Sequence, residues 1–69
     1  ELNIKIEKAD EQNVSLEIYT MDGHFIRAYS KQVTYNTITL DDLRYLSGGM
    51  YMVVYTLDNK RYSFKFIKR

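Results

Sequence analysis

The side chains that could carry out chemistry are few in this sequence and lie far apart along it. His24 is the single histidine, and it follows Gly23 in a polar segment. Acid–base or nucleophilic catalysis needs a partner nucleophile or a second ligand within reach of that imidazole, and no residue has a convincing spacing to supply one. We therefore interpret His24 as an exposed turn residue, and we predict no catalytic residue and no enzyme activity for this chain.

Two acidic pairs, Asp10-Glu11 and Asp41-Asp42, are the remaining candidates for a metal site. Calcium requires about six to eight oxygen ligands, and the spacing of an EF-hand is missing. The chain has no cysteine, which removes thiolate metal sites and disulfides alike. We predict no metal and no cofactor, and we interpret Asp42 as a cap for a short helical turn that follows it.

Aromatic side chains are the other group with binding potential, because their rings can stack on sugars or bases. The seven tyrosines are spread over most of the chain, at Tyr19, Tyr29, Tyr35, Tyr45, Tyr51, Tyr55 and Tyr62. This spread favours packing at the rim of a sheet with each hydroxyl in water. The net charge is +1, from ten basic and nine acidic residues, so no segregated basic face is indicated and no nucleic-acid partner is predicted.

The elements that must position these residues are predicted to be strands, because hydrophobic and polar residues alternate along most of the chain. The predicted strands are Glu1–Lys8, Val14–Thr20, Phe25–Ser30, Thr34–Leu40, Met50–Leu57 and Arg61–Lys68. Met50–Leu57 is apolar on both faces, which indicates the central strand. Six strands joined by short turns predict a single domain over residues 1–69, folded as an antiparallel β-sandwich of about six to seven strands.

The connections carry their own signals. The Asp-Gly step within Met21–His24 predicts a two-residue hairpin turn, and Lys31–Gln32 is interpreted as a polar connection. Within Asp41–Ser47 and the residue before it, leucine recurs at every third position, which predicts one tight turn whose leucines close one end of the core. Gly48-Gly49 follows directly, and we expect a backbone with positive φ where this turn enters the next strand.

Three segments stand in a fixed order: Leu16–Gly23 (LEIYTMDG), Leu43–Tyr51 (LRYLSGGMY) and Lys65–Arg69 (KFIKR). Together they resemble the type A C-terminal sorting domain of proteins exported by the type IX secretion system of Bacteroidetes. In that family a strand xIYxxxG opens a hairpin, LxxLxxGxY follows, and a lysine-rich strand closes the polypeptide. The matching positions and the neighbouring glycine are Ile18, Tyr19, Gly23, Leu43, Leu46, Gly48, Gly49 and Tyr51.

The resemblance implies an Ig-like sandwich that serves as a secretion signal for a cargo protein attached in cis, and the cargo itself can be an enzyme such as a protease. It implies that the domain is the C-terminal part of a larger precursor that crosses the periplasm to the cell surface. The type IX translocon and a surface sortase are the implied partners. The residues implied in translocon recognition are Lys65, Phe66, Ile67, Lys68 and Arg69, with arginine where the family more commonly ends in lysine.

Other functions stay open on the residues alone. A carbohydrate-binding or fibronectin-like accessory module would show an aligned row of aromatic side chains on one sheet face. An adhesive module would dimerise by pairing exposed strand edges. Without the resemblance, Lys65–Arg69 is simply an edge strand whose lysines discourage aggregation.

Overall fold

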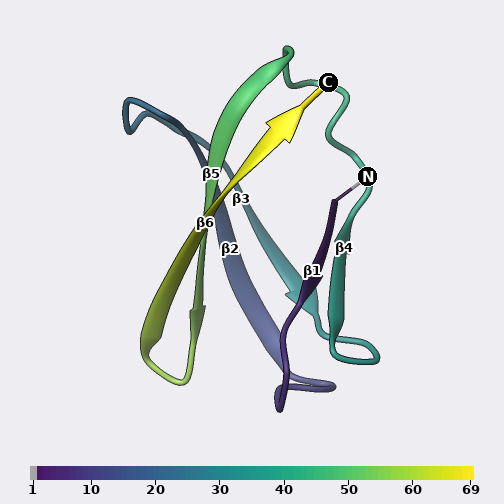
Figure 1. Cartoon of the computed structure of the whole chain (residues 1–69). Coiled ribbons are helices and arrows are strands. Elements are labelled where there is room, and N and C mark those ends of the chain that lie inside the picture. The colour runs from purple at the N-terminus through teal and green to yellow at the C-terminus, as the bar shows by residue number, and fades with distance from the viewer. Residues whose placement is uncertain (1) are drawn as a thin grey trace.

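The computed structural model describes residues 2–69 as six antiparallel strands in two sheets (Figure 1). The strands are β1 (Leu2–Lys5), β2 (Asn13–Thr20), β3 (Phe25–Gln32), β4 (Thr37–Leu40), β5 (Gly49–Leu57) and β6 (Lys60–Lys68). The larger sheet has the order β3-β2-β5-β6, and β1 pairs with β4 in the smaller one. The prediction of an all-β, sandwich-like fold of about six strands is confirmed.

The core lies between the two sheets, and its strand residues follow the alternation seen in the sequence, whereas Ala9 and Val33 are buried in connections between strands. Leu16 and Ile18 of β2 and Val53 of β5 have no exposed surface. Burying a side chain of this size stabilises the fold by roughly 1.5–3 kcal/mol. Within the described residues the buried set is apolar: Ile4, Ile6, Ala9, Val14, Leu16, Ile18, Val33, Ile38, Leu40, Leu43, Leu46 and Val53.

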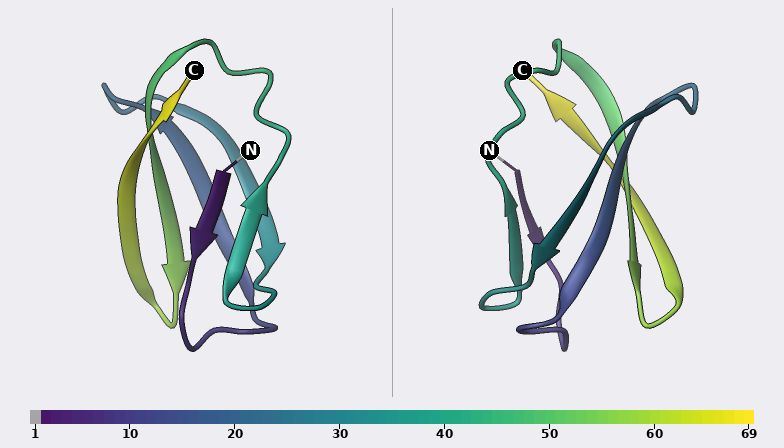
Figure 2. Two further views of the ribbon diagram at one scale, coloured as in Figure 1. Left: turned by 45° about the vertical axis from the view of Figure 1, so that its right-hand side comes forward. Right: turned by 180° about the vertical axis from the view of Figure 1, so that it is seen from behind.

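β5 is an inner strand of the larger sheet, as predicted, and β2 is the second inner strand. β6 lies at the edge, because it follows β5 as the last strand in the sheet order; it is the yellow strand next to the green β5 in Figure 2. Asp58 and Asn59 have φ values of 52° and 64°, which makes the β5–β6 connection a two-residue turn. The pairing runs without interruption from Leu57↔Lys60 to Gly49↔Lys68.

The β2–β3 turn differs from the prediction of a two-residue loop. The Gly23 amide donates to the Thr20 carbonyl (3.0 Å), and the Thr20 amide donates to the His24 carbonyl (2.9 Å). With Gly23 at φ 93°, this is a three-residue loop that ends in a left-handed glycine. The Thr20 hydroxyl stabilises this longer loop, because it donates to the Asp22 carboxylate and accepts from the His24 amide.

Three predicted strand boundaries were wrong. Lys31–Gln32 is the end of β3 and pairs with β2, because polar residues are compatible with an edge strand. The predicted strand Thr34–Leu40 begins only at Thr37, because Tyr35 and Asn36 adopt left-handed φ values of 52° and 57° that turn the chain. The predicted strand Glu1–Lys8 ends at Lys5, and its residue Glu1 lies outside the described residues.

The leucine-rich segment forms a turn and no helix in the part of the chain that the structure describes. The Leu46 amide donates to the Leu43 carbonyl (3.1 Å), which closes a single turn. Leu40, Leu43 and Leu46 are all buried, so the prediction that they close one end of the core is confirmed. The prediction that Asp42 caps a helix was wrong, since its carboxylate is exposed and has no helix to cap.

Candidate recognition surface

The three segments singled out in the sequence meet at one end of the larger sheet. Tyr51 of β5 pairs with Thr20 of β2 on one side and with Phe66 of β6 on the other. Gly49, at the start of β5, pairs with Lys68. The β2–β3 loop, the start of β5 and the C-terminus all lie at the top of Figure 1. We call this end of the sheet, which carries Gly23, Gly48-Gly49 and Arg69, the glycine end.

The two glycines before β5 play different parts. Gly49 has φ 154°, a region that side chains rarely adopt, and this confirms the expected positive φ at the entry to the strand. Gly48 has no such φ, and a Cβ there would lie 3.6 Å from the Lys68 carbonyl oxygen, an ordinary contact. The conformational requirement for glycine therefore falls on Gly49 alone.

Tyr51 connects the leucine turn to the C-terminal strand. Its hydroxyl donates to the Ser47 carbonyl (2.7 Å). Its ring stacks on Phe66, with 5.6 Å between centroids and 27° between planes. Leu43 and Leu46 of the turn belong to the buried core against which Tyr51 and Phe66 also pack. The position of β6 at the glycine end is thus fixed by ring packing as well as by strand pairing.

The C-terminal segment alternates between anchored and exposed side chains. Phe66 is half-buried and packs against the core, whereas Lys65, Ile67 and Arg69 are exposed. Lys68 is half-buried, and its ammonium donates to the Arg69 carbonyl (3.3 Å). This edge therefore presents two cationic side chains and one large apolar side chain, Ile67, which is 60% exposed.

Among residues 2–69 the structure brings no catalytic set together. His24 lies in the β2–β3 loop, as predicted, with Nδ1 3.2 Å from the Asp22 carboxylate, and both side chains are exposed. The hydrogen bond from Thr20, with a smaller contribution from His24, holds the pKa of Asp22 below its usual value. Within residues 2–69 no three metal-binding side chains lie close enough together to hold an ion.

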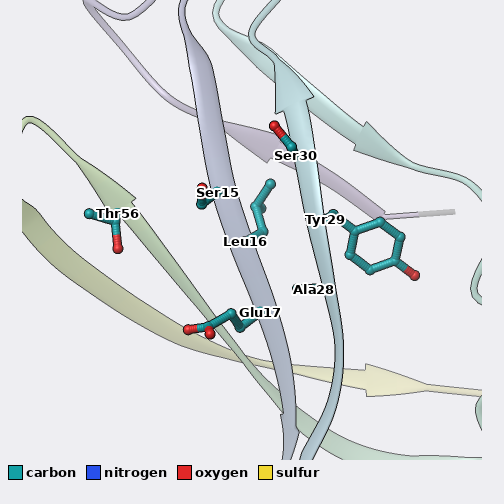
Figure 3. Close-up of a pocket in the computed structure, with 7 residues that line it drawn as sticks. All are labelled: Ser15, Leu16, Glu17, Ala28, Tyr29, Ser30 and Thr56. Carbon is teal, nitrogen blue, oxygen red and sulfur yellow. The ribbon is translucent and has the colours of Figure 1, made fainter.

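A shallow hollow on the larger sheet is the other candidate binding feature (Figure 3). Glu17 is the only acid among its lining residues, and its carboxylate lies 3.8 Å from the Arg61 guanidinium. A half-buried acid that already faces a cation has no partner among these lining residues for acid–base chemistry. The lining residues are Ser15, Leu16, Glu17, Ala28, Tyr29, Ser30 and Thr56.

Comparison with known families decides between the open interpretations. A family model described as the secretion system C-terminal sorting domain matches residues 1–69. The chain belongs to this family. No curated protein and no solved structure matches the chain. The domain is therefore a sorting domain of the Por, or type IX, secretion system, a non-catalytic secretion signal, and the resemblance seen in the sequence is confirmed. In the described part of this sorting domain no helix is long and apolar enough to span a membrane.

The sorting domain contains a cluster of side chains that sequence reasoning missed. The hydroxyls of Tyr29 on β3 and Tyr45 in the leucine turn lie 2.6 Å apart. The Arg27 guanidinium sits 5.4 Å and 5.2 Å from the centres of these two rings. Burial and the hydrogen bond to Tyr45 raise the pKa of Tyr29 to about 12. No periodicity links two residues this far apart in the sequence, so only the fold could reveal that they join β3 to the turn.

The aromatic residues are also less scattered than the sequence suggested. One row lies on the core-facing side of β5 and β6, and its members are Tyr51, Tyr55, Tyr62, Phe64 and Phe66. Tyr55 stacks on Tyr62 (5.0 Å, 19°) and contacts Phe64 edge-on (6.3 Å). Rings that cover one another leave little open face for a sugar. This row therefore supports packing of the sheet more than a carbohydrate platform.

The opposite face of the sheet is less covered than a central strand with two apolar faces would predict. Along the outer face, Tyr19 contacts Phe25 edge-on (5.8 Å), and Tyr19 also pairs with Met52. Phe25 is 56% exposed, and Met50, opposite Ile67, is 46% exposed. The second apolar face of β5 is thus an open surface at the glycine end.

Proposed function

We propose that the sorting domain is recognised through its last strand, with Lys65, Phe66, Ile67, Lys68 and Arg69 as the segment that the type IX translocon binds. The observation that carries the proposal is the place of this segment on the edge strand β6. An edge strand is accessible to a second protein along its whole length.

The contacts of the segment support two different roles for its residues. Phe66 stacks on Tyr51 and holds the strand in place. Lys65 and Ile67 project from the opposite face of β6, where both are exposed. In this proposal Phe66 contributes stability, and the exposed cations with Ile67 contribute the contacts to the translocon.

Membership in the family implies interaction with the Por secretion machinery and secretion to the cell surface or outside. We further propose that residues 1–69 form one domain attached to a cargo protein in cis. The domain crosses the periplasm with its cargo, is recognised at the outer membrane, and is then removed by a surface sortase. Dimerisation by strand pairing is the alternative use of the same edge.

Export of a reporter in a type IX host tests the recognition segment. A periplasm-directed reporter fused to the 69-residue chain is expected at the cell surface, and the same fusion without Lys65–Arg69 is expected to stay in the periplasm. Because the deletion also removes the Phe66 ring, a matched fusion carries Lys65→Ala, Lys68→Ala and Arg69→Ala and keeps Phe66. We expect it to lose most surface delivery as well. Equal surface delivery by all three fusions would refute the assignment.

A further inference from the structure

β6 presents an unpaired backbone edge in addition to its side chains. The two-residue turn makes Leu57 and Lys60 a hydrogen-bonded pair, and the register continues without a bulge along the strand. Every second residue from Lys60 onward therefore directs its N–H and C=O toward β5. The backbone groups of Arg61, Ser63, Lys65 and Ile67 point the other way, toward the free edge.

β3, the other edge of the larger sheet, is a poorer surface for pairing. A bulge between Ile18 and Tyr19 shifts its register with β2, and bulges discourage the addition of a further strand. Its far end is held by the Gln32 side chain, which donates to the Glu11 carbonyl (3.1 Å). β6 is longer and its pairing is regular, so the larger sheet can be extended most readily at β6.

The side chains of β6 define what a neighbouring strand must carry. On the core-facing side, a new strand would lie beside Tyr62, which is exposed, and beside Phe64 and Phe66, which are half-buried. On the outer side it would lie beside Lys65 and beside Arg61, whose guanidinium also lies 3.8 Å from the Glu17 carboxylate of β2. Opposite charges and apolar pairs at directly facing positions stabilise neighbouring strands, so the complementary sequence alternates apolar and acidic residues.

We propose that β6 binds an acidic extended segment of a partner protein by strand addition. The backbone of that segment pairs with Ser63, Lys65 and Ile67, its apolar side chains cover Phe64 and Phe66, and its carboxylates face Arg61 and Lys65. This inference rests on the proposed function, and it specifies the chemistry of the surface in the secretion machinery that recognises the domain.

A second copy of the domain is a poor occupant of this edge because β6 carries Lys60, Arg61, Lys65 and Lys68 and no acidic residue. An antiparallel β6–β6 pair centred on Phe64 sets Lys60 opposite Lys68 twice. A pair centred on Ser63 sets Arg61 opposite Lys65 twice. Like charges at directly facing positions destabilise a strand pair, so the charges of β6 select against self-pairing.

Binding of two designed peptides to the 69-residue chain tests the proposal. One peptide alternates valine with glutamate, and its control alternates valine with lysine. We expect the acidic peptide to bind at least about tenfold more tightly, because its carboxylates face the cations of β6. Amide hydrogen exchange read by NMR is expected to slow at Ser63, Lys65 and Ile67, whose N–H groups become paired, and to stay unchanged along β3.

Two pairs of variants separate backbone pairing from simple charge attraction. Ser63→Pro removes one outward N–H while leaving the bonds to β5, so it is expected to abolish binding, and Ser63→Ala is expected to bind normally. Lys65→Glu is expected to weaken binding of the acidic peptide about tenfold, whereas Lys5→Glu on β1, with the same change in net charge, is not. Circular dichroism of each variant shows whether the strands remain folded.

Three outcomes would overturn the inference: no binding of the acidic peptide at millimolar concentration, equal binding to folded Ser63→Pro, or protection confined to β3. Protection of the β6 amides that rises with protein concentration in the absence of peptide would also overturn it, in favour of a dimer. None of these results bears on whether Lys65–Arg69 directs export, since the reporter fusions measure that separately. Conversely, the acidic peptide could bind the chain while deletion of Lys65–Arg69 leaves export unimpaired. Strand addition at β6 would then be supported, but it would have no role in sorting.

Discussion

At the scale of single residues, the sorting motif is distributed between residues that shape the backbone and residues that pack. Gly49 sets the entry to β5 through its φ of 154°, and Tyr51 two residues later joins the Ser47 carbonyl to the Phe66 ring. The glycine and the tyrosine of the family pattern GxY thus act together. The first directs the chain into the strand, and the second fastens the C-terminal strand to it.

Substitution of the two neighbouring glycines tests this division. Gly49→Ala is expected to lower the free energy of unfolding by about 1–3 kcal/mol, because its φ lies in a region open essentially to glycine. Gly48→Ala, where the added methyl group meets the Lys68 carbonyl oxygen at 3.6 Å, is expected to change it by less than about 1 kcal/mol. Urea unfolding of both variants provides the measurement. Equal losses would show that crowding at the glycine end, and not φ, explains the glycines.

At the scale of single residues, the sequence predicted the structure correctly where one residue type is needed for one backbone conformation. The positive φ at Gly49 could be predicted because glycine adopts it at low cost. The length of the β2–β3 loop could not be predicted, because it depends on the Thr20 hydroxyl, which reaches both Asp22 and the His24 amide. The Asp-Gly signal for a two-residue turn takes no account of a side chain outside the loop, such as that of Thr20.

At the scale of elements, the leucine turn is held from two directions. Leu43 and Leu46 pack into the core, and Tyr45 between them reaches Tyr29 of β3. Tyr45, which is exposed, thus links this turn to the edge strand β3. The same turn also accepts the Tyr51 hydroxyl at its Ser47 carbonyl, and Tyr51 stacks on Phe66 of β6. The contact between Tyr29 and Tyr45 is therefore connected, through the turn, to the position of β6.

The alkaline pH dependence of stability tests the link between Tyr29 and Tyr45. The pKa of Tyr29 is raised to about 12 in the folded state from an ordinary value of 10, so the folded state binds its phenolic proton more tightly. This contribution is fully present below pH 10 and is lost as pH rises toward 12. Tyr29→Phe is therefore expected to lose less stability than the native chain over this interval, as measured by urea midpoints. Tyr35→Phe, at a tyrosine that is 88% exposed, should follow the native curve.

The strands themselves were largely predictable, because one buried face imposes alternation on the sequence. In the predicted strand Val14–Thr20 the apolar residues of the alternation, Val14, Leu16 and Ile18, are all buried. The errors fell where the chain leaves one sheet for the other. By composition, Tyr35 and Asn36 are acceptable in a strand. In the structure their left-handed φ values make them a turn, and Thr34 pairs with Thr37 across it. That pairing is not visible in the pattern of hydrophobic and polar residues.

At the scale of the whole molecule, the order of the strands in the larger sheet determines which parts of the sorting signal are accessible to a partner protein. Alternation shows which side chains point inward but not which strand lies at an edge. The order β3-β2-β5-β6 places the C-terminal strand at a free edge, where Lys65 and Ile67 are exposed. The candidate site was therefore predictable as a segment of sequence through its family resemblance. Its lysines had already made an edge strand one interpretation of the segment. The strand pairing that leaves one side of β6 free, and the open apolar face beside it, became visible only in the fold.

This arrangement predicts that stability and signal can be separated by substitution. The variant with alanine at Lys65, Lys68 and Arg69 is expected to have a free energy of unfolding within about 1 kcal/mol of the native chain. Lys65 and Arg69 are exposed and Lys68 is half-buried at the end of an edge strand, and surface charges contribute little to stability. Thermal and urea unfolding of the purified domain provide the measurement. A loss of several kcal/mol in this variant would mean that its expected export defect reflects unfolding, and the recognition role of the cations would then lack support.

The opposite substitution lies in the core and should act through stability alone. Ile18 has no exposed surface, and Ile18→Asp would bury a carboxylate with no partner at a cost of several kcal/mol. A domain of this size has a margin of about 5 kcal/mol, so the variant is expected to lose its β-sheet signal in circular dichroism. Glu17→Gln, one position earlier on the outer face, is expected to remain folded and to lose only its ion pair with Arg61. Retention of native circular dichroism by Ile18→Asp would contradict the assignment of β2 as the centre of the core.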